Sequence, residues 1–316
     1  MTPDEVLAAL EKKIHDFYAD AVAELNEEIQ DYFAKLAIRE KQQRILLEAG
    51  KITEEEFKQW RLAQYGRGER FIALRDNLAE RMYQANVIAT AYINNDMATV
   101  YALGHAHTIE WVQEELGDLL AGVDFTLINE EAVRRLMMED PDLMPDYFPT
   151  PLEIAQGRDM EYSRKQITAS ITSSIIQGKS VTAIAADLMD RIQGMGEVSA
   201  IRAARTALGA AQEAGHQAAR DELQSKGVIM GKRWDAAWDN RVRPDHALAD
   251  GQTVANDELF TVGGEKLMYP CDKKHGASPR NIYNCRCRAV DVIMGFKSIL
   301  TPEQQAKANI QVSVKR

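Results

Sequence analysis

The chain has 316 residues, which is enough for two domains with separate hydrophobic cores. A composition of 45% hydrophobic and 27% charged residues is typical of an ordinary folded protein and argues against wholesale disorder. We expect neither a signal peptide nor a membrane helix. The N-terminus lacks a basic region followed by an apolar run, and no stretch approaches about 18 consecutive apolar residues.

The net charge of −10 is distributed unevenly along the chain. Residues 1–157 contain 15 Lys and Arg against 30 Asp and Glu, a net charge of −15, whereas residues 158–316 contain 23 against 18, a net charge of +5. Solvated helix faces in both halves would account for the contrast. It also fits an acidic half that contacts proteins and a mildly basic half that approaches nucleic acid.

The first 140 residues are predicted to form long helices, because their apolar residues recur at three- and four-residue steps. Two capping boxes, Thr2 with Glu5 and Thr53 with Glu56, open the first two helices, and Gly50 ends the first. A third helix runs on towards Gly117, with a break expected near residues 94–95. Helices of this length joined by short turns indicate an extended bundle or hairpin.

Four prolines within residues 140–151 cannot continue a helix and predict an extended, exposed linker. We therefore expect a helical N-terminal domain at 1–140, a linker at 141–151, a second domain at 152–300 and a tail at 301–316.

The second domain is predicted to be α+β, with its helices first and a small sheet after them. Glycines at 194 and 196 are expected to separate its second helix from its third. The expected helices span about 152–177, 181–192 and 197–225, and β-prone segments follow at 228–230, 232–234, 259–261 and 289–293. The whole chain is thus predicted to be mainly α, with a small α+β C-terminal domain.

From about residue 197 to residue 292 the sequence resembles the head-morphogenesis domain of the phage Mu protein F family. The ordered set of motifs carries the resemblance, since each motif alone is common. The matching elements are Arg205-Thr206, Trp234, the Asp239-x-Arg241-x-Arg243-x-x-His246 segment, Asp250-Gly251 and the final Asn284-Cys285-Arg286-Cys287.

This resemblance implies a minor head protein of a tailed bacteriophage, located in the virion and assembled in the host cytoplasm. Such proteins associate with the portal and assist procapsid assembly and DNA packaging or ejection. The implied partners are the portal protein and the major capsid or scaffold protein. The basic half would make any non-specific contacts with DNA. The resemblance implies no membrane partner.

The motif residues also have a physical interpretation of their own. Asp239, Arg241, Arg243 and His246 lie on a tight polar turn, where guanidinium groups can hold carboxylates in two-point pairs. The Asp250-Gly251 pair is a turn signal, because glycine readily adopts positive φ. Two aromatic side chains, Trp234 and Phe260, are expected to anchor this region in the core. We therefore interpret the motif as a structural polar network rather than a catalytic site.

Three cysteines, Cys271, Cys285 and Cys287, lie in the last 50 residues, an odd set that fits a reducing cytoplasm. Together with His275, and with His246 upstream, they offer the ligands of a structural zinc site. Residues two apart in a strand share a face, although Cys-x-Cys is tighter than the usual spacing. A zinc site at Cys271, His275, Cys285 and Cys287, plain buried thiols, and a disulfide such as Cys271–Cys285 are the three alternatives.

The competing function is a metal-dependent nuclease, in which Asp239, His246, Asp250 and His275 would bind an ion and activate water. No recognised nuclease motif is complete in the sequence. Ala207 also stands where the family often has Glu, which removes one group that a catalytic role would use. A fused effector domain, which occurs in some relatives, is not expected because the chain ends about 20 residues after the motif. We therefore expect no enzymatic activity.

Overall fold

The computed structural model describes residues 1–297 apart from residues 67, 121–122, 127 and 140–157. These residues form two compact units, each built from segments that are distant in sequence. Unit 1 contains residues 1–10 and the described residues of 92–147 and 202–316. Unit 2 contains the described residues of 11–91 and 148–201. The predicted linker at 141–151 and tail at 301–316 lie outside the described residues, so that division of the chain stays a prediction.

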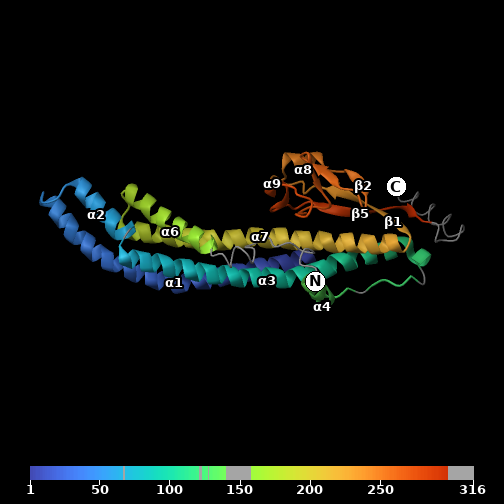
Figure 1. Ribbon diagram of the computed structural model, residues 1–316, viewed down its shortest axis with the longest axis horizontal. Helices are drawn as coiled ribbons and strands as arrows, with labels where there is room; N and C mark the ends of the chain where they lie inside the picture. The colour runs from blue at the N-terminus through green and yellow to red at the C-terminus, as the bar shows by residue number, and fades with distance from the viewer. Residues whose placement is uncertain (67, 121–122, 127, 140–157, 298–316) are drawn as a thin grey trace. The chain divides into compact units, whose positions relative to one another are not determined.

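The protein is mainly α-helical with a small antiparallel sheet towards the C-terminus, which confirms the predicted fold class (Figure 1). Both predicted capping boxes form: the backbone N–H groups of Glu5 and Glu56 donate to the hydroxyls of Thr2 and Thr53, each at 3.2 Å. The helices are α1 (Pro3–Glu48), α2 (Glu54–Gly66), α3 (Glu69–Leu116), the 3-10 helix η1 (Gly117–Leu120), α4 (Glu130–Glu139), α6 (Arg158–Ile176), α7 (Val181–Ser225), α8 (Pro244–Leu248) and α9 (Pro279–Ile282). None of the described helices combines the length and apolar character needed to cross a membrane.

The sheet of unit 1 has the strand order β2-β1-β5, with both pairs antiparallel. The central strand β1 (Val228–Asp235) joins two segments that the sequence predicted separately. It pairs with β2 (Thr253–Ala255) on one side and β5 (Arg288–Phe296) on the other. The strands β3 (Phe260–Val262) and β4 (Glu265–Leu267) form a second, two-stranded sheet. The sequence missed β2 and β4, because three residues are too few to show an alternating pattern.

Unit 2 is a helical bundle whose core comes from apolar stripes on α1, α2, α3, α6 and α7. One polar pair lies inside it: the hydroxyl of Tyr18 donates to Oδ1 of Asn86 at 2.5 Å. The buried residues of α1 recur at helical spacing and include Ile14, Tyr18, Val22, Leu25, Ile29, Phe33 and Leu36. The burial of this stripe is what the three- and four-residue periodicity predicts for a helix with one face in a core.

The two helix breaks expected from the sequence were wrong. α3 continues through residues 94–95, and α7 continues through Gly194 and Gly196. A Cβ at position 196 would lie 2.3 Å from Cε1 of Tyr18, so this glycine lets α1 approach α7 closely and does not end the helix. The expectation failed because the role of a helical glycine depends on a neighbour far away in sequence.

In unit 1, glycines likewise allow two helices, the C-terminal part of α3 and α7, to approach each other closely. A Cβ at Gly104 would lie 2.4 Å from the carbonyl oxygen of Gln212, and one at Gly215 would lie 2.1 Å from the carbonyl oxygen of Tyr101. Beyond this crossing, a hydrophobic core joins α3 and η1 to the end of α7 and to β1. Its buried members are Ile109, Val112, Leu116, Leu119, Leu120, Ala219, Leu223, Val228 and Met230.

Candidate functional site

The motif region of unit 1 is built around Trp234, the penultimate residue of β1, whose side chain is fully buried. The indole ring contacts His246 of α8 edge to face, with ring centroids 5.6 Å apart, and contacts Phe260 of β3 in the same way at 5.3 Å. The carbonyl of Trp234 accepts from the N–H of Gly251, which has φ +74°. Trp234 thus joins β1, α8, β3 and the Asp250-Gly251 turn in one small core.

The acidic motif residues bond to partners different from those that the sequence suggested. Asp239 was expected to pair with the side chains of Arg241 and Arg243. Instead, its Oδ1 accepts from Nη2 of Arg286, 47 residues away, at 2.8 Å, and from the backbone N–H of Arg241 at 2.9 Å. Asp250 accepts from the N–H of Ala236 at 2.8 Å. These carboxylates hold loop segments together through hydrogen bonds, as expected of a structural polar network.

Two motif residues hold the backbone immediately before Cys285. The buried hydroxyl of Thr206, on α7, accepts from the N–H of Asn284 at 2.8 Å. Nη2 of Arg243 donates to the carbonyl oxygen of Tyr283 at 2.5 Å. Asn284 itself has φ +56°, a left-handed conformation that asparagine tolerates better than most residues. Arg205, one residue before Thr206, lines a neighbouring cavity together with Cys285.

A cluster of nitrogen and sulfur atoms lies where these constraints converge. The Sγ atoms of Cys285 and Cys287 lie 3.4 and 3.5 Å from Nδ1 of His246. One ligand atom from each of the three residues falls within 4.8 Å of the other two, and all three side chains are buried. Nε2 of His246 is buried without a hydrogen-bond partner among the described residues. We call this group the His-Cys cluster.

Neither of the other two predicted zinc ligands, Cys271 and His275, is a member of the His-Cys cluster, and their surroundings differ. The thiol of Cys271 is buried and donates to the carbonyl oxygen of Cys285 at 3.8 Å, and the proximity of this thiol together with burial raises the pKa of Cys285 to about 12. By contrast, Nδ1 of His275 lies 2.6 Å from Oδ2 of Asp272, and His275 is not a member of the His-Cys cluster. The geometry therefore puts His246 in the place that the sequence gave to His275. All three cysteines are free.

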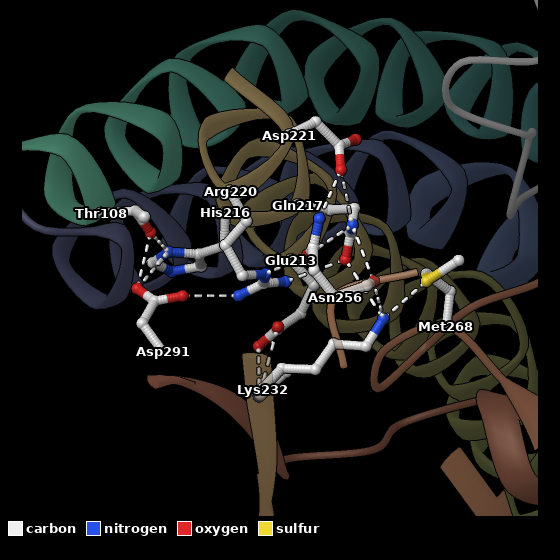
Figure 2. A network of polar contacts seen from close by, with 11 residues as sticks. Thr108, Glu213, His216, Gln217, Arg220, Asp221, Lys232, Asn256, Met268 and Asp291 are labelled. Carbon is white, nitrogen blue, oxygen red and sulfur yellow. Dashed lines mark hydrogen bonds and ion pairs between the residues drawn. The ribbon is translucent and has the colours of Figure 1, made fainter. Parts of the chain in front are cut away.

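A second polar cluster, which the sequence did not predict, lies in the interior of unit 1 between α7 and the sheet (Figure 2). Its centre is Arg220, whose side chain is fully buried. The guanidinium group donates to Oδ1 of Asp291 on β5 at 2.6 Å and to Oδ1 of Asn256 at 3.1 Å. Oδ2 of Asp291 accepts from the hydroxyl of Thr108, on α3, at 2.7 Å. The buried charge pair thus ties α3, α7 and β5 together.

Burial shifts two further groups of this network towards neutral forms. The ammonium group of Lys232, on β1, donates to the carbonyl oxygen of Asn256 at 2.8 Å, and burial lowers its pKa to about 7. The carboxyl group of Glu213, on α7, accepts from the N–H of Ala289 at 3.2 Å, and burial raises its pKa to about 7. Both shifts arise because the charged form is disfavoured away from water.

A second possible ligand group combines His107, His216 and Asp291. Its geometry is already accounted for without an ion. Asp291 carries the ion pair with Arg220, and Nδ1 of His216 lies 2.7 Å from the hydroxyl of Thr108. Burial lowers the pKa of His216 to about 4. A cation here would have to compete with a buried guanidinium group, so we assign this group to the structural network.

The residues of the nuclease hypothesis do not converge. Among the described residues, no three of Asp239, His246, Asp250 and His275 place ligand atoms within reach of one ion. Asp239 is instead paired with Arg286, and His275 with Asp272.

One signal in the sequence would have revealed the buried network. On α7, Glu213 is followed at three and four residues by His216 and Gln217, and these are followed at four and three residues by Arg220. The flanking faces of the helix are rich in buried alanine, as at positions 203, 207, 210, 211, 214 and 219. A polar stripe at helical spacing between small apolar residues indicates a buried polar face that needs partners from other elements.

Residues 165–290 match the family model described as Phage Mu protein F like protein, so this part of the chain is similar to that family. The matched range contains the motif turn, the His-Cys cluster and the buried network apart from Thr108 and Asp291. It begins in α6 and ends within β5.

Two curated relatives extend the comparison. The chain is 30% identical over 153 residues to minor head protein GP7 of Bacillus phage SPP1, which covers 46% of this chain and 47% of the relative. It is 29% identical over 143 residues to NAD(+)--arginine ADP-ribosyltransferase EFV of Enterococcus faecalis, which covers 45% of this chain and 28% of that enzyme. The match thus spans less than half the length of either relative. No solved structure gives a significant match.

Proposed function

We propose that this protein is a minor head protein of a tailed bacteriophage, a virion component that works beside the portal during procapsid assembly and DNA packaging or ejection. The observation that carries the proposal is the Mu protein F-like match over residues 165–290, together with the likeness to a phage minor head protein. The proposed partners are the portal protein and the major capsid or scaffold protein, with assembly in the host cytoplasm.

The geometry of the motif supports a structural role for it. The carboxylates of Asp239 and Asp250 are bonded within the domain, to Arg286 and to the backbone of Ala236. Thr206 and Arg243 hold the chain before Cys285. Groups held in such bonds position loops and are not poised to activate water. We therefore propose a role without a catalytic step.

The acidic helical half is the proposed contact surface for the other head proteins. It has a net charge of −15 over residues 1–157. α1 exposes Ile38 and Ile45, with 66% and 56% of their surface accessible, seven residues apart and therefore on one helix face. Apolar side chains on an acidic helix suit docking onto a partner surface that combines basic and apolar groups.

The test must avoid deleting the N-terminal half, because parts of α1 and α3 belong to the same unit as the motif region. Phage would be assembled with a chain carrying Ile38→Ser and Ile45→Ser, and its amount in purified heads measured by immunoblot. We expect strongly reduced incorporation with an unchanged circular dichroism spectrum. Leu248→Ser, at a side chain 86% exposed on α8, is the matched control and should incorporate normally. Normal incorporation of the double variant would contradict the proposed surface.

Contact with DNA is proposed for the basic half, residues 158–316, with a net charge of +5. Binding through Lys and Arg releases counterions, so affinity should fall steeply with salt and be insensitive to sequence. Fluorescence anisotropy with two unrelated duplexes at several salt concentrations would measure both properties. A clear preference for one duplex, or an affinity independent of salt, would contradict this mode of binding.

The nuclease and ADP-ribosyltransferase activities are tested directly. The purified chain would be incubated with plasmid DNA and Mg²⁺ or Mn²⁺, and separately with labelled NAD⁺ and an arginine-rich acceptor protein. We expect no product in either assay. DNA cleavage that is lost in a folded Asp239→Asn variant would replace the structural proposal by an enzymatic one.

A further inference from the structure

We propose that the His-Cys cluster is a structural zinc site in which His246, Cys285 and Cys287 bind one ion and Cys271 supplies the fourth ligand. This inference goes beyond the proposed function, because it concerns how the domain is stabilised and holds for any role of the protein. Four ligands drawn from Cys and His are the usual set of a closed, structural zinc site.

The distances fit a shared tetrahedral ion. With Zn–N and Zn–S bonds of about 2.1 and 2.3 Å and tetrahedral angles, a nitrogen ligand and a sulfur ligand lie about 3.6 Å apart. The Sγ atoms of Cys285 and Cys287 lie 3.4 and 3.5 Å from Nδ1 of His246. A ring nitrogen has a single hydrogen or a single lone pair in the ring plane. Two sulfurs at equal distances are therefore better satisfied by one ion than by one hydrogen bond.

The fourth ligand follows from the neighbours of Cys285. The thiol of Cys271 is buried and lies 3.8 Å from the carbonyl oxygen of Cys285. Cys271 also has φ +67°, a left-handed backbone conformation that is uncommon for a residue with a side chain. The contact with the carbonyl oxygen of Cys285 places Cys271 beside the cluster, in a turn that contains no other cysteine.

The surroundings suit the charge of such a site. Three thiolates, one neutral imidazole and Zn²⁺ give a net charge of −1, which must be balanced when buried. A cavity of about 280 Å³ next to Cys285 is lined by Arg205, Arg286 and Arg288. Arg286 and Arg288 are paired with the carboxylates of Asp239 and Asp4, so their positive charge at the edge of the cluster is partly offset. The cavity offers an entry path for the ion.

The local fold gives a reason for an ion at this position. Between β1 and β5 the regular elements are very short: α8 has five residues, α9 has four, and β2, β3 and β4 have three each. Elements of this length are not stable alone, and small loop-rich folds commonly rely on metals or disulfides. The cluster joins α8, the turn at Cys271 and the extended segment before β5, and the three cysteines are free. Zinc would cross-link these three segments.

The first experiment uses the full wild-type chain, purified without a metal-binding tag from cells grown with added zinc. We expect about one zinc ion per chain by elemental analysis, and X-ray absorption that shows three sulfur ligands and one nitrogen ligand. Replacement by Co²⁺ should give the intense visible absorption of a tetrahedral thiolate site. Zinc-free protein with three reduced thiols, a Cys271–Cys285 disulfide, or bound zinc without sulfur ligands would each overturn the proposal.

Variants then test the ligand set. Cys287→Ser and His246→Ala should each lose most of the bound zinc and melt at a lower temperature. His275→Ala is the matched control, since His275 lies in the same loop-rich region but bonds Asp272, and it should keep the full zinc content. Cys271→Ser should change the X-ray absorption from three sulfur ligands to two, or lose the ion. Full zinc content with an unchanged ligand count in Cys271→Ser or Cys287→Ser would overturn the assignment.

Discussion

The substitution Glu213→Gln is expected to change how the stability of unit 1 depends on pH. Burial raises the pKa of Glu213 from its ordinary value of 4.5 to about 7. Because the folded-state pKa lies above the unfolded-state value, the stabilising contribution is fully present below pH 4.5 and is lost as pH rises through 7. A shift of this size corresponds to about 3 kcal/mol of unfolding free energy.

Glutamine keeps an oxygen that can accept from the N–H of Ala289 but carries no titrating proton. Any constant cost of its amide group is the same at every pH, so the informative quantity is the difference in stability between variant and wild type at each pH. Between pH 5 and pH 8 this difference should shift in favour of the variant by about 2–3 kcal/mol. Lys232 titrates in both proteins, so its contribution cancels from the difference.

The assay is urea unfolding of both proteins at pH 5, 6, 7 and 8. Hydrogen exchange in peptides that contain Ala289 would confirm that the change arises in β5. Glu114→Gln, at an exposed position of α3, controls for the loss of one negative charge and should show little dependence on pH. A difference between Glu213→Gln and wild type that is the same at pH 5 and pH 8 would refute the reasoning that burial keeps this carboxyl group protonated.

Two further predictions concern packing and the buried ion pair. Gly215→Ala should lower the unfolding free energy by about 1–3 kcal/mol, because its methyl group would meet the carbonyl oxygen of Tyr101 at 2.1 Å. Gly209→Ala, where nothing lies closer than 3.4 Å, should not destabilise the same helix, and equal thermal shifts in the two variants would contradict this account. Asp291→Ala should cost about 3–5 kcal/mol in chemical denaturation, because it leaves Arg220 buried without its carboxylate. The double variant Arg220→Met with Asp291→Leu should cost less, and an equal or larger loss would show that the uncompensated charge is not the cause.

The features that could be predicted from sequence are those in which the interacting residues lie within one helical turn of each other in the chain. Thr2 and Glu5 are three residues apart, so the capping box that they form is readable without knowledge of the rest of the fold. The apolar stripe of α1 is equally local, because helical periodicity alone brings its residues to one face. The side chains of Cys285 and Cys287 point to the same side of the chain, because the two residues lie two positions apart in one extended segment.

The features that were missed or misplaced depend on residues far away in the chain. Gly196 was interpreted as a break because nothing near it in sequence shows that Tyr18 packs against it. Asp239 was assigned to its neighbouring arginines, whereas its partner is Arg286. The predicted ligand set included His275 and not His246, yet the fold brings His246 of α8 to the thiols.

The sequence by itself determined the helical character of the chain, the capped helix starts and the likeness of residues 165–290 to the Mu protein F family, because periodicity, capping and ordered motifs are properties of contiguous segments. Only the tertiary structure decided which histidine meets the cysteines and which charges are buried together. Arg220 and Asp291 are 71 residues apart, and nothing local indicates that they meet. A buried charge requires a partner, but the partner is selected by how α7 and β5 pack, which is a property of the whole unit.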